Sequence, residues 1–84
     1  MSKIIHCYVQ MFSRTVTMVV EDNGVGIMLR QLGYNGYEEQ LLSYAKELDI
    51  PHIHLIGNKL FLQKTVNKIK TNTKYNYNVE VTVN

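Results

Sequence analysis

Residues 50–83 read IPHIHLIGNKLFLQKTVNKIKTNTKYNYNVEVTV, and this stretch decides the class of fold. A short apolar run at 52–56 follows a proline, residues 60–70 have helical spacing, and residues 75–83 alternate apolar with polar side chains. A strand that returns to the same sheet through a helix lies parallel to the strand it left. With a further helical stretch at 38–48, the order predicts an α/β domain.

The predicted sheet is apolar on one face only. In the last strand, the side chains that share the apolar face are Tyr75, Tyr77, Val79, Val81 and Val83. Between them lie Asn76, Asn78, Glu80 and Thr82, and residues 15–21 repeat the alternation, with Val16, Met18 and Val20 on one side. Successive side chains of a strand point to opposite faces. We therefore expect helices on one face and an open, polar surface on the other.

The first half of the chain predicts an opening β-hairpin. Strands are expected at 4–11 and 15–21, joined by the loop 12–14, and residues 25–29 form either a third strand or the start of a crossover. Asn35 and Glu38 resemble a capping box for the first helix, and Asn58 is placed to cap the second. The inward-facing positions should be Leu41, Ala45 and Leu48 on the first helix and Leu62, Val66 and Ile69 on the second.

The resulting order, β-β-(β)-α-β-α-β in a single domain of residues 1–84, resembles the core of the ribonuclease H-like fold, with a mixed sheet and helices on one face. By this resemblance, a nuclease of the same fold would carry one carboxylate in its first strand and another after its fourth strand. The two carboxylates would hold metal ions. Here the first strand has no carboxylate, and the turn after 52–56 offers the neutral Asn58. A domain of this kind would be a catalytically dead scaffold.

Residues 22–27, DNGVGI, look like the DNGxG box of the gyrase and histidine-kinase type ATPases. That family also has a preceding helix with a metal-binding asparagine and a later glycine-rich lid. Neither is present here, and Asn23-Gly24 is explained by a tight turn. We expect no ATP binding by this route.

Composition limits the class of protein further. An 84-residue chain buries only about 60–65% of the surface that its unfolded form exposes, so a homo-oligomer is expected. The single cysteine, Cys7, suits a reducing cytoplasm and is expected to be buried as a small hydrophobic residue. No apolar run is long enough to cross a membrane. Size and an Asn-, Lys-, Ile- and Tyr-rich composition suggest a phage or mobile-element protein.

The sequence contains no recognisable catalytic or metal-binding motif. His52 and His54 share one face of their strand, but no closed set of four ligands accompanies them. Cys7 lies on the opposite face from His6, and no serine or threonine has a base beside it in a known motif. We therefore expect a non-enzymatic protein with no metal and no cofactor.

The predicted binding site is the open sheet face together with a neighbouring loop. It comprises His6, Tyr8, Thr15, Thr17, His54, Tyr34, Asn35 and Tyr37. Aromatic and polar side chains of this kind form adaptable protein contacts. We expect stoichiometric binding to a host protein, with modulation or inhibition of host machinery as the function.

The alternative partner is a nucleic acid or a nucleotide. Residues 1–58 hold four Lys or Arg against six Asp or Glu, whereas residues 59–84 hold five lysines against Glu80 alone. The candidate anion-binding residues are Asn58, Lys59, Lys64 and Lys68, at the start and along one side of the second helix.

Overall fold

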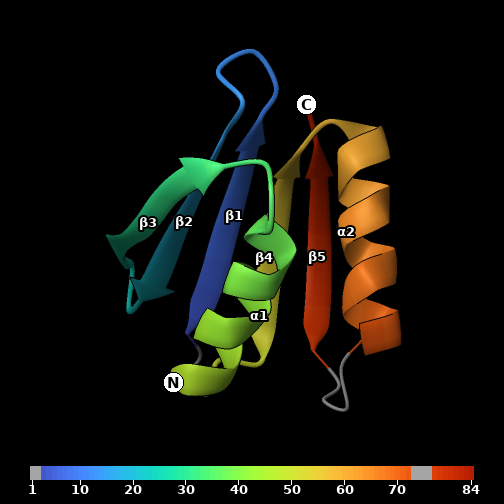
Figure 1. Ribbon diagram of the computed structural model, residues 1–84. Coiled ribbons are helices and arrows are strands. Elements are labelled where there is room, and N and C mark those ends of the chain that lie inside the picture. Colours follow the sequence, from blue (N-terminus) through green and yellow to red (C-terminus); the bar gives the residue numbers. More distant parts are fainter. Residues whose placement is uncertain (1–2, 73–76) are drawn as a thin grey trace.

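In the part of the chain that the structure describes, five strands form one mixed sheet in the order β3-β2-β1-β4-β5 (Figure 1). The computed structural model describes residues 3–72 and 77–84. Its elements are β1 (Ile4–Gln10), β2 (Thr15–Asp22), β3 (Val25–Gly33), α1 (Tyr37–Glu47), β4 (His52–Gly57), α2 (Lys59–Asn72) and β5 (Asn78–Val83). The β1–β2 and β2–β3 pairs are antiparallel, and the β1–β4 and β4–β5 pairs are parallel. The α/β class and the ribonuclease H-like topology are confirmed.

Both helices lie on one face of this sheet, and the other face is open (Figure 1). The cause is the alternation along the central strands. Ile5, Cys7 and Val9 of β1 are buried beneath the helices, while the residues between them face the other way. Ile53 and Leu55 of β4 continue the same buried layer. The one-sided sheet predicted from the sequence is confirmed.

The two helices begin in different ways. The Asn58 Oδ1 accepts a hydrogen bond of 3.0 Å from the Leu60 backbone N–H, so the predicted cap of α2 is confirmed. The predicted capping box at Asn35 is wrong, because α1 is preceded by Gly36 in a left-handed conformation (φ 78°) with no side-chain cap. A glycine adopts this conformation without a steric penalty.

The inward faces of the helices are mostly as expected. Leu41 and Ala45 of α1 are buried, as are Leu62 and Ile69 of α2, and Val66 is half-buried. Leu48 is 42% exposed. It lies at the C-terminal cap of α1, past the last turn that packs on the sheet, so its predicted inward position is wrong.

β3 is longer than the predicted 25–29. Asn23 and Gly24, with φ values of 54° and 81°, turn the chain between β2 and β3, as the primed hairpin turns require. Met18 then pairs with Arg30 and Val19 with Met28, which leaves Leu29 as the extra residue of a β-bulge. A bulge shifts the alternation of side chains by one residue. The sequence pattern therefore did not predict the second half of the strand.

The last strand begins later than predicted. It runs over Asn78–Val83, and residues 75 and 76 of the predicted strand lie outside the described ranges. Tyr77 and Val79 pack against the core, but Val81 and Val83 are about half exposed. In the described ranges, neither helix is long and apolar enough to cross a membrane.

Gly57, at the end of β4, is a position where a side chain would not fit. A Cβ atom there would lie 2.8 Å from the Val9 carbonyl oxygen. We expect Gly57→Ala to lower the free energy of unfolding by about 1–3 kcal/mol through overpacking, measured by urea denaturation. Gly33→Ala is the matched control, since its Cβ would meet only the Arg14 carbonyl oxygen at 3.9 Å. Equal losses in both variants would contradict the steric explanation.

Candidate functional site

The open face of the sheet gathers five of the predicted binding residues. Strand register places His6 of β1 opposite His54 of β4, and Tyr8 of β1 opposite Thr17 of β2. Thr15 lies at the beginning of β2 on the same face, opposite Gln10. The grouping therefore follows from the pairing of β1 with β2, the next strand along the chain, and with the distant β4.

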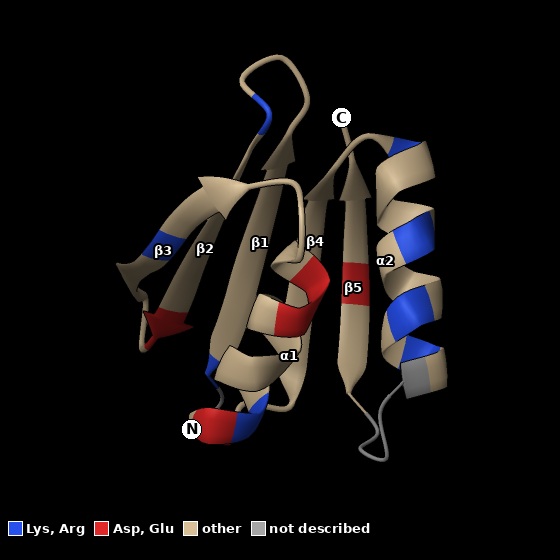
Figure 2. Ribbon diagram, in the orientation of Figure 1, with Lys and Arg blue, Asp and Glu red and all other residues tan. Residues whose placement is uncertain are grey.

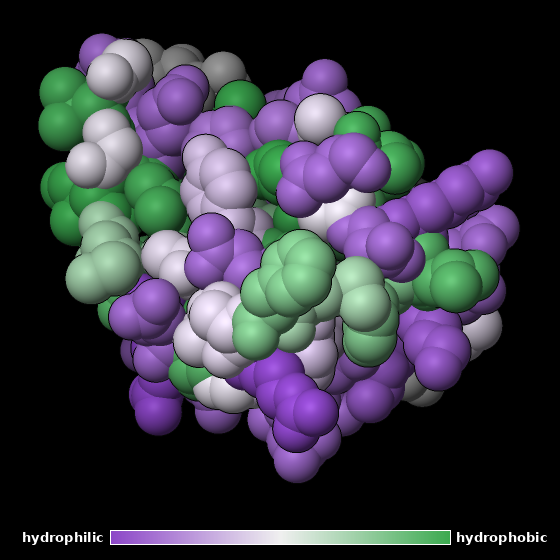
Figure 3. Space-filling model, turned by 90° about the horizontal axis from the view of Figure 1, so that it is seen from above, coloured by the Kyte–Doolittle hydropathy of each residue, from purple (hydrophilic) through white to green (hydrophobic). Residues whose placement is uncertain are grey.

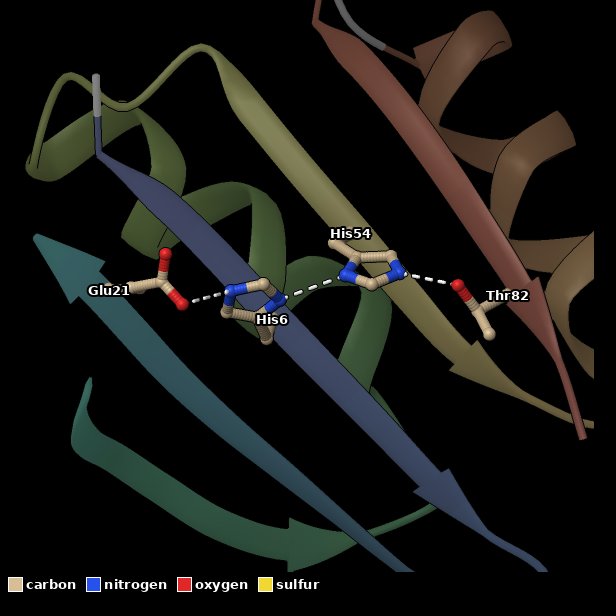
Figure 4. A network of polar contacts seen from close by, with 4 residues as sticks. All are labelled: His6, Glu21, His54 and Thr82. Carbon is tan, nitrogen blue, oxygen red and sulfur yellow. Dashed lines mark hydrogen bonds and ion pairs between the residues drawn. The ribbon is translucent and has the colours of Figure 1, made fainter. Parts of the chain in front are cut away.

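Four side chains on this face form a continuous chain of polar contacts across four strands (Figure 4). The Glu21 Oε1 lies 3.3 Å from the His6 Nε2, and the His6 Nδ1 lies 2.9 Å from the His54 Nδ1. The His54 Nε2 then lies 2.7 Å from the Thr82 Oγ1. The His6 side chain is only 15% exposed, so the middle of the chain is shielded from water by its neighbours.

With both imidazoles neutral, one assignment of protons satisfies every contact. A neutral imidazole has one N–H donor and one acceptor nitrogen. Thr82 donates to the His54 Nε2, the His54 Nδ1–H donates to the His6 Nδ1, and the His6 Nε2–H donates to Glu21. A single added proton is accommodated if His54 changes tautomer and donates to Thr82 instead. Two added protons would place two N–H groups against each other at 2.9 Å.

The network makes a specific spectroscopic prediction. At a pH where both rings are neutral, ¹⁵N-resolved NMR should show His54 protonated at Nδ1 and His6 protonated at Nε2. Glu21→Gln can also accept from His6 through its carbonyl oxygen, so it should keep this pattern, whereas Glu21→Ala should increase tautomer exchange at His6. Protonation of the neutral His6 at Nδ1 would contradict the assigned direction of the chain.

The two imidazoles do not make a metal centre by themselves. Among residues 3–72 and 77–84, no group of three or more His, Cys, Asp or Glu side chains is placed to hold a metal ion. Glu21 contacts His6 on the nitrogen that points away from His54. The arrangement is a set of mutually satisfied polar side chains on a half-buried surface.

The loop residues Tyr34, Asn35 and Tyr37 do not join this face, contrary to the sequence prediction. Tyr37 is 3% exposed, and its hydroxyl is hydrogen-bonded to the Thr65 hydroxyl of α2. Tyr34 stacks on Phe61 with ring centroids 5.1 Å apart, and Asn35 is exposed in the turn before α1. The chain crosses to the helix side immediately after β3, and these aromatic rings fill the space between the two helices.

The spacing of Tyr37 could have revealed its burial. It lies four residues before Leu41 and eight before Ala45, which places it on the inward stripe of α1. Thr65 likewise falls between Leu62 and Ile69 on the buried side of α2. The sequence prediction places Tyr37 in the preceding loop because it expects the first helix at 38–48, whereas α1 begins at Tyr37.

The candidate anion-binding residues are only partly available. The Asn58 side chain caps α2, and the Lys68 Nζ lies 2.6 Å from the Glu39 Oε1 of α1. This contact lowers the pKa of Glu39 and raises that of Lys68. Lys59 and Lys64 are exposed. Figure 2 shows acidic residues of α1 on the same side of the molecule as the lysines of α2.

The sequence did not reveal an open cavity of about 540 Å³ between the hairpin loop and the start of α2. Its walls include Val9, Met11, Phe12, Asn58 and Asn84, from the carboxyl ends of β1 and β5 and the segments beside them. Phe12, at the tip of the hairpin, is fully exposed. The contributors lie far apart in the sequence, so no local pattern indicates the cavity.

Cys7 is a buried structural thiol, as expected. Burial raises its pKa from 9.0 to about 12, and the Glu38 carboxylate adds to the rise. Thiolate is the reactive form of cysteine. The folded protein should therefore react very slowly with a thiol reagent.

The raised pKa of Cys7 also predicts a loss of stability at alkaline pH. The unfolded thiol loses its proton near pH 9, whereas the folded thiol keeps it up to about pH 12. The free energy of unfolding should fall above pH 9 with a slope approaching about 1.4 kcal/mol per pH unit. Urea denaturation between about pH 8 and 10 should show this fall in the wild type and a flatter profile in Cys7→Ala. Identical profiles would contradict it.

No protein-family model matches this chain, and none of the curated proteins does. Among solved structures, Pelota from Archaeoglobus fulgidus overlays with a TM-score of 0.73 at 8% identity, over 95% of this chain and 26% of Pelota. A Ppx/GppA family member from Aquifex aeolicus overlays with a TM-score of 0.45 at 9% identity, over 98% of this chain and 35% of that chain. The Pelota likeness supports the fold class, that of a small α/β domain with ribonuclease H-like topology, and this chain spans about a quarter of Pelota.

Proposed function

We propose that this protein acts by stoichiometric binding of another protein through the open sheet face. His6, Tyr8, Thr17 and His54 would form the centre of the contact. Its biological setting would be that of a phage or mobile-element accessory factor that modulates or inhibits host machinery. The observation that carries the proposal is the sheet face opposite the two described helices, on which Glu21, His6, His54 and Thr82 are already paired with one another.

Internal pairing makes the face suitable for burial against a partner. A polar group that loses water without gaining a hydrogen bond costs roughly 1–3 kcal/mol. Along the Glu21–His6–His54–Thr82 chain, each imidazole nitrogen already has a protein contact. A partner could therefore cover His6 and His54 without leaving them unsatisfied, and Tyr8, 39% exposed beside them, would supply aromatic contact area.

The proposal is for binding rather than catalysis. The strand that carries the first carboxylate in ribonuclease H-like nucleases has none here, and Asn58, after β4, is a neutral amide that caps α2. Two-metal phosphodiester cleavage needs both carboxylates to hold the ions. Magnesium-dependent cleavage of any nucleic acid would overturn this part of the proposal.

Photo-crosslinking tests the binding face directly. A benzophenone side chain in place of Tyr8 should crosslink one partner protein in cells of the native host. The same group in place of Gln63, exposed on α2, should not. With the partner purified, Tyr8→Ala should weaken binding about tenfold or more, as for a central aromatic contact, while Gln63→Ala should leave the dissociation constant unchanged. Equal crosslinking from both positions, or an unaffected Tyr8→Ala, would refute the assigned face.

A second candidate is binding of a nucleotide or single-stranded nucleic acid beside the start of α2. It is favoured by the open cavity that adjoins Asn58 and by the exposed Lys59 and Lys64. Fluorescence anisotropy with a labelled oligonucleotide and with a labelled ATP analogue would test it. Binding that weakens steeply with salt and disappears in Lys59→Glu/Lys64→Glu would support this candidate.

A further inference from the structure

β3 is an edge strand that carries exposed apolar side chains on both of its faces. It is outermost in the sheet order, next to β2. Val25, Ile27 and Met28 are 60–63% exposed. Register places Ile27 opposite Val20 on the helix side and Met28 opposite Val19 on the open side. Seen from the hairpin end, hydrophobic surface gathers on the left, the side on which β3 lies (Figure 3).

This edge has few of the features that keep strand edges apart. Natural edges are protected by lysines, prolines, inward-pointing charges, β-bulges, short length or a covering helix. β3 is nine residues long and contains no Lys, Pro, Asp or Glu; its one charged residue is Arg30, and its one irregularity is the bulge. The opposite edge, β5, has six residues with Glu80 among them, and α2 packs against it. The β3 edge is therefore less protected than the β5 edge.

The charges beside β3 are arranged so that the strand is complementary to itself. Glu21 and Asp22 pair with Gly26 and Val25, at the beginning of β3. Arg30 lies in its second half, and the Arg14 backbone lies beside Gly33 at its end. Figure 2 shows the acidic colour at the β2 arrowhead and the basic colour on β3 and in the hairpin loop. Two antiparallel copies would bring each acidic end against a basic end, twice.

We propose that a second copy of this chain covers the β3 edge, through antiparallel β3–β3 pairing about a two-fold axis near Ile27 and Met28. The apolar halves of the two strands would overlap at the axis. Arg30 of each copy would then face Val25 of the other, on the same side of the sheet as Asp22, the residue that pairs with Val25. The two sheets would become one continuous sheet, with both open faces on the same side. A two-fold contact closes on itself and stops at a dimer. The inference does not depend on the partner of the open face.

Sedimentation velocity of the 84-residue protein between about 1 and 200 μM tests the proposal. The wild type should be a concentration-dependent dimer. Ile27→Lys, which places a charge at the axis, should raise the dimer dissociation constant at least about 100-fold. The matched control is Val81→Lys on β5, also partly exposed, which should leave the dissociation constant unchanged. Circular dichroism would verify that both variants are folded.

A charge exchange tests the geometry separately. Arg30→Glu should weaken the dimer about tenfold, because it sets like charges against each other. Asp22→Lys should do the same. A mixture of the two variants should restore dimerisation as a heterodimer, since every contact then joins opposite charges. A structural effect of either substitution would not be rescued by mixing.

Hydrogen exchange of the wild type gives a readout that needs no variant. Amide exchange in β3 should slow about tenfold or more from the lowest to the highest concentration, with no change in β5. A wild-type monomer at all concentrations would overturn the proposal. So would a dimer that resists Ile27→Lys but is lost in Val81→Lys, or open filaments, which would indicate head-to-tail pairing of β3 with β5.

Discussion

The parallel pairing of β1 with β4 is the constraint on which the rest of the structure depends. It places Ile5 beside Ile53 and Cys7 beside Leu55, and these residues form the floor of the core under both helices. The strands approach closely at their ends, where only a glycine fits at position 57 next to the Val9 carbonyl. β1 lies between β2 and β4, and alternate side chains of this central strand point into the core.

The same register has a consequence for the open face. A pairing that aligns buried residues on one side of a sheet also aligns the alternate residues on the other side. His6 and His54 therefore meet because Ile5 and Cys7 pack where they do. The position of the polar network is a by-product of core packing, and Glu21 and Thr82 extend it because β2 and β5 flank the central pair. A partner that covers this face would contact side chains of paired strands rather than of a loop.

The helix side is joined by contacts between residues far apart in the sequence. Tyr37 and Thr65 share a buried hydrogen bond, Tyr34 stacks on Phe61, and Lys68 pairs with Glu39. These contacts explain why two short helices hold their positions over the sheet. They also remove from the surface two residues that the sequence suggested for binding, Tyr37 and in part Lys68. The β3 edge is left without a covering helix, so its apolar residues stay exposed.

The sequence by itself determined the fold class, the strand-helix order and the open face, because side-chain alternation with periods of 2 and 3.6 is a local property of strands and helices. It also located the Asn58 cap and the burial of Cys7, which depend on neighbouring residues. It did not reveal the second half of β3, since the bulge at Leu29 breaks the alternation on which strand prediction relies. Only the tertiary structure decided that His6 meets His54, that Tyr37 is buried and that Lys68 is paired, because each depends on a residue at least 28 positions away. Such contacts form only when distant segments of the chain pack together, and no local sequence pattern predicts them.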